Sequence, residues 1–212
     1  MPPPRSTARR RSRPRLSGPE RRAAIVEAAG ALFAEHGYDR TSIDRIAEAA
    51  EITVPVIYDH FASKRDLYVA VLRIQAARLV EATTRVEAGA PLETVVRVNV
   101  EAFFEFVERQ PAAWRMLFVD STADPEIAKV HREVQAQATA RLAVTVVAAA
   151  PALKLSVEVP RPLAEQMLAE LGKSALNGLA VWWWEHPETP RGLVAAVAMD
   201  LLWRGVRGIA RA

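Results

Sequence analysis

Hydrophobic residues recur every three or four positions along most of this chain, which is the period of an amphipathic α-helix. The first such run starts after Ser17, where Glu20 completes a capping-box pattern and Pro19 fits the first helical turn. One side of this run carries Ile25, Ala28, Ala29, Leu32, Phe33 and His36. Gly37 then supplies a stop, so the pattern predicts a helix over residues 17–37.

Two short helices follow, joined by a turn that allows only a steep crossing. The second helix starts at Ser42, with Thr41 or Ser42 as its cap, and the third starts at a new cap, Thr53. Pro55 suits the first turn of the third helix. The apolar residues spaced to hold these helices together are Ile43, Ile46, Ala47, Ile52, Ile57 and Phe61. This arrangement is typical of a helix-turn-helix.

The pattern stays helical in the rest of the chain. A longer helix is predicted over residues 63–86, bridging the small unit to everything that follows. Helical periodicity then resumes, between prolines, over residues 92–109, 112–119, 126–148, 163–184 and 191–209. Sustained strand alternation is not seen, and only residues 155–159 allow an extended segment. The predicted fold class is therefore all-α.

Composition limits the chemistry that the chain can perform. Half of its residues are hydrophobic, it has no cysteine, and its four histidines lie far apart. These features exclude a disulfide framework and disfavour a metal site, and no catalytic grouping or phosphate-binding glycine loop is visible. No apolar stretch reaches the roughly 18 residues needed to cross a membrane. We expect a cytoplasmic protein that is not an enzyme and holds no cofactor or metal.

The basic charge is concentrated at the start of the chain. The first 22 residues contain eight arginines and a single acidic residue, Glu20. Residues 1–16 are poor in hydrophobic residues and rich in proline and arginine, so we expect a disordered basic arm. The arm is either a solubilising extension or a segment that reaches the phosphates or the minor groove of DNA.

Residues 25–71 resemble the N-terminal domain of the tetracycline-repressor (TetR) family of bacterial transcriptional regulators. The motifs that carry the resemblance are Leu32-Phe33, His36-Gly37-Tyr38, Thr41-Ser42-Ile43, Arg45-Ile46-Ala47, Ile57-Tyr58-Asp59-His60-Phe61, Ser63-Lys64 and Leu67. Two residues depart from the family pattern, because Glu51 and Pro55 stand where the family usually or often has glycine. Glu51 brings a carboxylate to the turn, with local strain if a positive φ is needed there. Pro55 removes a backbone donor from the reading helix.

The resemblance implies a DNA-binding domain over residues 17–62. It assigns phosphate contacts to Tyr58, His60 and Lys64, base contacts to Thr53, Val54 and Pro55, and the anchoring of the first crossing helix to Thr41 and Arg45, whose side chains also suit phosphate contacts. Each phosphate contact has a structural alternative. In these alternatives, Tyr58 is a core aromatic residue with its hydroxyl at the surface, His60 caps a helix end, and Lys64 is an ordinary solvated charge.

The resemblance also implies a larger domain, here residues 63–212, that binds a small effector and forms a homodimer. The apolar positions expected at the dimer interface are Leu171, Ala175, Leu179, Trp182, Val194, Val197 and Leu201. Two such helix pairs, one from each subunit, can form a four-helix bundle. The alternative is that these positions form the core of a single subunit.

Candidates for the effector pocket are a polar residue and a group of large apolar residues: Asn99, Phe103, Phe106, Trp114, Phe118, Met167 and Trp183. Such a group is also typical of ordinary packing, and Asn99 is equally plausible as a satisfied buried amide. Because few charged residues are candidates for the interior, an apolar or aromatic ligand is favoured over a phosphate.

The resulting hypothesis is a dimeric repressor with two reading helices in successive major grooves of a pseudo-palindromic operator, about 34–36 Å apart. Effector binding would tilt the bridging helix and release the DNA. One rival hypothesis is a helical enzyme or small-molecule carrier with a degenerate DNA-binding head. Another is a regulator that has no ligand.

Overall fold

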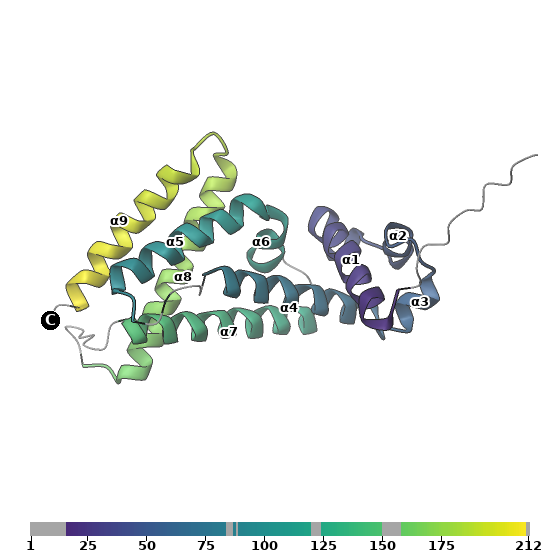
Figure 1. Ribbon diagram of the computed structural model, residues 1–212, viewed down its shortest axis with the longest axis horizontal. Helices are drawn as coiled ribbons and strands as arrows, with labels where there is room; N and C mark the ends of the chain where they lie inside the picture. The colour runs from purple at the N-terminus through teal and green to yellow at the C-terminus, as the bar shows by residue number, and fades with distance from the viewer. Residues whose placement is uncertain (1–15, 84–86, 88, 120–123, 150–157, 211–212) are drawn as a thin grey trace, which may run out of the picture.

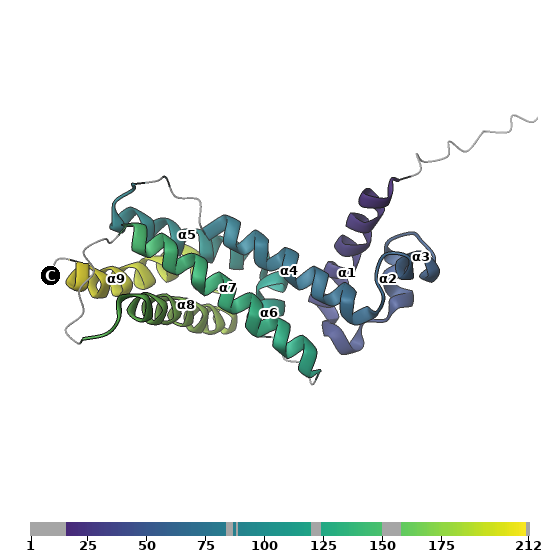
Figure 2. The same ribbon diagram turned by 90° about the horizontal axis from the view of Figure 1, so that it is seen from below.

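The computed structural model describes residues 16–83, 87, 89–119, 124–149 and 158–210. All regular secondary structure within these ranges is helical, which confirms the predicted fold class. Figure 1 shows an elongated molecule with a small head at one end, made of α1 (Gly18–Arg40), α2 (Ile43–Ala49) and α3 (Val54–Tyr58). Helix α4 (Lys64–Thr83) runs from the head along the larger body (Figure 2).

Helix α1 begins where the capping pattern predicted. The carboxylate of Glu20 accepts the backbone N–H of Ser17 at 2.8 Å and the hydroxyl of Ser17 at 2.7 Å. These hydrogen bonds keep the pKa of Glu20 below its usual value. At the other end Gly37 breaks the helical backbone, with φ 76° and ψ 171°, and the helix continues beyond it to Arg40. The predicted stop at Gly37 is therefore a kink, and the helix ends later than expected.

The head is held together by side chains that the apolar pattern predicted. Phe33, Ile46 and Ile57 are fully buried and bring all three helices of the head onto one core. Ser42 caps α2 by accepting the backbone N–H of Arg45 at 3.3 Å. The short helices α2 and α3 are thus held by tertiary packing, because helices of this length are not stable alone.

The body consists of α4 together with α5 (Leu92–Arg109), α6 (Pro111–Phe118), α7 (Pro125–Ala149), α8 (Arg161–Glu185) and α9 (Arg191–Ala210). Helix α7 packs against α4 and α8, and α9 packs along α5 (Figures 1 and 2). These bounds follow the predicted ones to within a few residues. The arm over 1–15, the end of the bridging helix over 84–86, and most of the 155–159 segment lie outside the described residues. No helix in the described part of the chain has the length and hydropathy to span a membrane.

Large aromatic residues connect the helices of the body. Trp114 on α6 is fully buried, and its indole N–H donates to Oδ1 of Asn177 on α8 at 3.1 Å. Phe104 on α5 is also fully buried and meets Trp183 of α8 edge-on, with ring centroids 5.9 Å apart. The indole N–H of Trp183 donates to the carbonyl of Thr189 at 2.8 Å. The hydrogen bonds fix ring positions that burial alone would leave less specific.

The head is joined to the body at the first turns of α4. Asp124 at the start of α7 accepts a hydrogen bond from Nε of Arg65 at 3.0 Å. Tyr68 of α4 lies edge-on to both Phe33 and Tyr38 of α1, with centroids 4.9 Å apart in each pair. Burial, together with the charge of Asp124, raises the pKa of Tyr38. One cluster therefore contains side chains from α1, α4 and the start of α7.

Replacing Gly37 by alanine tests the kink in α1. The backbone at Gly37 lies in a region that residues with a Cβ rarely adopt. We expect Gly37→Ala to lower the free energy of unfolding by about 1–3 kcal/mol in urea titrations. Gly172→Ala is the matched control, since Gly172 lies inside α8 with open space around its Cα. This control should stabilise by up to about 1 kcal/mol, and a Gly37→Ala variant as stable as the native chain would contradict the argument.

Candidate DNA-binding surface and ligand cavity

The start of α3 places two side chains at the surface. Thr53 and Pro55 are exposed, whereas Val54 is partly buried and packs against the head core. Thr53 makes no capping hydrogen bond to α3, so its hydroxyl is not used in holding the helix. Pro55 has no backbone N–H to offer. A partner at this surface would therefore meet mainly the Thr53 hydroxyl and the Pro55 ring, with Val54 shared between surface and core.

Two of the predicted phosphate-binding residues lie at the far end of α3. Tyr58 has 50% of its surface exposed, which excludes the alternative that it is a core aromatic residue. His60 follows α3 and is partly buried. Its backbone N–H donates to the carbonyl of Ile57 at 3.0 Å, so the main chain closes the turn at the end of α3. The phenol of Tyr58 is thus placed outward on a rigid turn.

Two cations, one on α2 and one at the start of α4, each lie beside a ring of α1. Nη2 of Arg45 lies 2.8 Å from Nε2 of His36, on the exposed side of α2. Nζ of Lys64 lies 4.4 Å from the centroid of the Tyr38 ring. Burial lowers the pKa of Lys64, and the nearby charge of Asp39 acts against this effect. Lys64 is therefore not an ordinary solvated charge, because its position is set by the head–body junction.

The turn between α2 and α3 contains the residue that departs from the family pattern. Among the described residues, Glu51 is the one non-glycine residue with a positive φ, which is 54°. This is the strained conformation that the sequence analysis anticipated if the turn required a positive φ. The backbone N–H of Ile52 donates to the carbonyl of Ala47 at 3.0 Å, which closes the turn over α2.

Thr41 does not have the role that the sequence suggested. Its side chain is buried, with 1% of the residue exposed. Its hydroxyl lies 2.8 Å from the carbonyl of Gly37 and 3.2 Å from the carbonyl of Leu32. The hydroxyl therefore satisfies carbonyl groups at the kink of α1 and is directed away from solvent. The prediction of a direct DNA contact from this hydroxyl is corrected to a positioning role at the end of α1.

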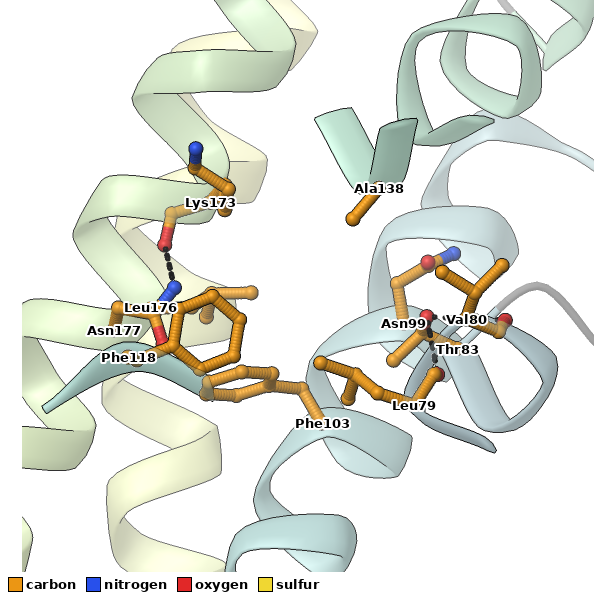
Figure 3. Close-up of a pocket in the computed structure, with 10 residues that line it drawn as sticks. All are labelled: Leu79, Val80, Thr83, Asn99, Phe103, Phe118, Ala138, Lys173, Leu176 and Asn177. Carbon is orange, nitrogen blue, oxygen red and sulfur yellow. Dashed lines mark hydrogen bonds between the residues drawn. The ribbon is translucent and has the colours of Figure 1, made fainter. Parts of the chain in front are cut away.

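A cavity of about 60 Å³ lies inside the body, and its wall is mainly apolar. Figure 3 shows Lys173, Leu176 and Asn177 of α8 on one side, opposite Asn99 of α5 and residues of α4. The residues that line the cavity are Leu79, Val80, Thr83, Asn99, Phe103, Phe118, Ala138, Lys173, Leu176 and Asn177. Asn99, Phe103 and Phe118 were predicted from the sequence, whereas those on α4, α7 and α8 were not.

The other four predicted lining residues lie outside this cavity. Phe106 and Trp114 are buried packing residues, and Trp183 is fixed by its hydrogen bond to Thr189. Met167 is exposed on α8. The predictions for Phe106, Trp114 and Trp183 are corrected because large apolar residues on a helix face point either to a cavity or to another helix, and the period alone does not separate the two cases. Met167 instead lines a separate pocket between α7 and α8.

The closing helices expose a row of apolar side chains. Of the predicted interface residues, Leu171, Ala175, Trp182, Val197 and Leu201 are exposed on α8 and α9. Leu179 is partly buried against the core of the body. Val194 has 3% of its surface exposed and belongs to that core, so its assignment to an interface is corrected. Met167 and Leu193 are exposed on the same two helices and were not predicted for this surface.

Comparison with known proteins places the head in a family. Residues 25–71 match the family model described as bacterial regulatory proteins, tetR family. The chain is 35% identical over 116 residues to the transcriptional activator FasR of Mycolicibacterium smegmatis, covering 54% of this chain and 53% of that protein. It is 39% identical over 61 residues to the transcriptional repressor AcnR of Corynebacterium diphtheriae, covering 29% of this chain and 32% of that protein. The matched part thus spans about half of the first relative and about a third of the second.

Solved structures extend the likeness in fold to the body. A TetR-like transcriptional regulator from Rhodococcus sp. RHA1 has a TM-score of 0.70 and 23% identity, covering 92% of this chain and all of that one. The regulator FadR from Bacillus subtilis, solved in complex with stearoyl-CoA, has a TM-score of 0.70 and 17% identity, covering 88% of this chain and 98% of that one. Identities this low show the fold alone. Residues 25–71 thus match the tetR family of bacterial regulatory proteins, and the fold of the rest of the chain is that of TetR-like regulators.

Proposed function

We propose that the protein is a ligand-controlled repressor that binds a pseudo-palindromic DNA operator as a homodimer. The observation that carries this proposal is the surface around α3. Exposed Thr53 and Pro55 lie at its start, exposed Tyr58 lies at its end, and Arg45 is exposed on α2. This surface combines side chains suited to the DNA groove with side chains suited to phosphates, on a head that has its own buried core.

The assigned DNA contacts follow from where each side chain lies. Thr53 and Pro55 face the bases, with a smaller share for Val54. Tyr58 and Arg45 hold phosphates on either side of the reading helix, and His60 and Lys64 support them from the turn and from the start of α4. Thr41 is left out of the contact set because its hydroxyl is buried against α1.

The dimer uses the exposed apolar side chains of α8 and α9. Two copies of these helices would bury this surface in a four-helix bundle. The exposed group contains Met167, Leu171, Trp182, Leu193, Val197 and Leu201. Exposed apolar side chains on two neighbouring helices are typical of an interaction site.

The effector acts by opening the cavity in the body. At about 60 Å³ the cavity is smaller than the roughly 300 Å³ at which small-molecule sites usually begin. A ligand must therefore spread the walls, which include Leu79, Val80 and Thr83 of α4. The same helix starts at Lys64 in the head–body junction, so a displacement at one end of α4 moves the reading heads apart. A ligand that prefers the open walls shifts the equilibrium toward release of DNA.

The salt dependence of operator binding tests the DNA contacts. We expect Arg45→Gln to weaken binding to a duplex selected by the native protein, and to lower the slope of log affinity against log salt by about two, one for each subunit. The control is Lys129→Gln, which removes one exposed cation from α7 in the body. Equal slopes for the native chain and both variants would remove Arg45 from the interface.

A second variant separates positioning from contact at the end of α1. Thr41→Val keeps the shape of a buried side chain and removes a hydroxyl that lies 2.8 Å from the Gly37 carbonyl. We expect a loss of about 1 kcal/mol in the free energy of unfolding. Operator affinity, measured well below the melting temperature, should stay within about twofold of the native value with an unchanged salt slope. A slope lowered as much as in Arg45→Gln would restore Thr41 as a phosphate contact.

Sedimentation velocity tests the dimer surface. We expect the double substitution Leu171→Glu and Leu201→Glu to convert the protein to monomers, because it places four carboxylates per dimer in an apolar contact. The control is Val144→Glu on α7, since Val144 and Leu201 are each 70% exposed. The control should remain dimeric. Dimers that persist in the double variant would place the interface elsewhere.

A further inference from the structure

The cavity wall contains one polar residue whose hydrogen bonding is incomplete. Asn99 of α5 has 7% of its surface exposed and lines the cavity. Its Nδ2 donates to the carbonyl of Val95, one turn earlier on the same helix, at 2.8 Å. Its Oδ1 is buried without a hydrogen-bond partner among the described residues. A buried acceptor in this condition is destabilising, so its presence in a cavity wall calls for a donor.

The orientation of the Asn99 amide is fixed by its neighbour. The carbonyl of Val95 can only accept a hydrogen bond, so the amide nitrogen must face it. Exchanging the nitrogen and the oxygen would place two acceptors together. Because the two atoms diverge from one carbon, the oxygen is turned away from its own helix. Oδ1 is therefore the acceptor of this amide that lacks a partner, whereas Nδ2 keeps one N–H beyond its hydrogen bond to Val95.

The other polar groups of the wall are already engaged. Asn177 accepts the indole N–H of Trp114 at 3.1 Å and donates to the carbonyl of Lys173 at 3.1 Å. The hydroxyl of Thr83 donates to the carbonyl of Leu79 at 2.9 Å. Among the polar side-chain atoms of this wall, Asn99 Oδ1 is thus the one that is buried without a hydrogen-bond partner within the described chain.

The cation beside the cavity is paired on the outside. Nζ of Lys173 lies 2.7 Å from Oε2 of Glu170, and in Figure 3 it points away from Phe103 and Phe118. The hydrogen bond from Lys173, assisted by one from Thr139, lowers the pKa of Glu170. Glu170 therefore stays ionised and holds the ammonium. An anion entering the cavity would meet the unpaired Asn99 oxygen, while the charge of Lys173 is already balanced by Glu170.

We infer that the ligand of this cavity is an uncharged, largely apolar molecule with a single hydroxyl or N–H donor directed at Oδ1 of Asn99. The inference rests on the proposed role of the cavity as the effector site and adds the chemical class of the effector. Phe103, Phe118 and Leu176 contact its apolar part. Asn99 selects the donor, because a ligand without one would leave the buried oxygen unsatisfied.

Three aromatic probes of similar size separate the possibilities. Phenol carries a donor, anisole carries the same oxygen capped by a methyl group, and benzoate carries a negative charge. Each is titrated into the full chain without DNA, and its affinity is measured by calorimetry. We expect phenol to bind about tenfold or more tightly than anisole, and benzoate to bind most weakly. Equal or reversed affinities of phenol and anisole, tighter binding of benzoate, or no binding of phenol would overturn the inference.

Two variants assign the preference to Asn99. In Asn99→Leu the preference for phenol should disappear, with anisole bound as well as phenol or better. In Thr83→Val, which changes another polar residue of the same wall without removing the Asn99 oxygen, the preference should remain. A preference that survives in folded Asn99→Leu, or that disappears in Thr83→Val, contradicts the assignment. Should Asn99→Leu fail to fold, the ranking of the three probes in the native chain still decides the matter.

Operator release plays no part in these titrations. Phenol-type selectivity without any effect of bound ligand on DNA affinity would overturn the proposed effector control and leave this inference standing. Ligand-induced DNA release without that selectivity would overturn this inference and leave the proposed effector control standing.

Discussion

The junction at the first turns of α4 determines how the head is held on the body, and the proposed coupling between the cavity and the head depends on it. The hydrogen-bonded ion pair of Arg65 with Asp124 is partly exposed, so it supplies little free energy by itself. Tyr68 supplies the buried area, since it lies against the aromatic rings of α1. The aromatic contacts thus stabilise the junction, while the ion pair fixes the orientation of α7 against α4.

Helix α4 converts this junction into a connection between two sites. Its first residue, Lys64, lies over the Tyr38 ring in the head, and residues of its last turns line the cavity. A helix of this length spans about 30 Å. Leu67, Val71 and Leu72 are buried along its course, and in the proposed mechanism the helix moves as one element between the two sites. In the proposed mechanism the cavity is smaller than its ligand. Such a ligand displaces the wall and therefore binds the two positions of α4 with different affinities.

The sequence predicted the helices well, because prolines and caps mark their ends and the apolar period marks their inner faces. Residues 92–109 form α5 from end to end. It predicted side-chain roles less well, because one face of a helix can have several neighbours. Val194 and Val197 lie three residues apart on α9, and only the packing of α9 against α5 shows that the first is inside and the second outside. Thr41 fits a phosphate-binding pattern, yet the kink at Gly37 creates carbonyl groups that its hydroxyl satisfies.

Helix α9 has two apolar faces, and this has a thermodynamic consequence. Val194, Ala195 and Ala198 belong to the interior of one subunit, whereas Val197 and Leu201 point outward. In the proposed dimer the same helix completes a subunit core and the contact with a second subunit, so unfolding and dissociation become one linked equilibrium. The melting temperature then rises with protein concentration, and the amount of regulator in a cell influences how much of it is folded.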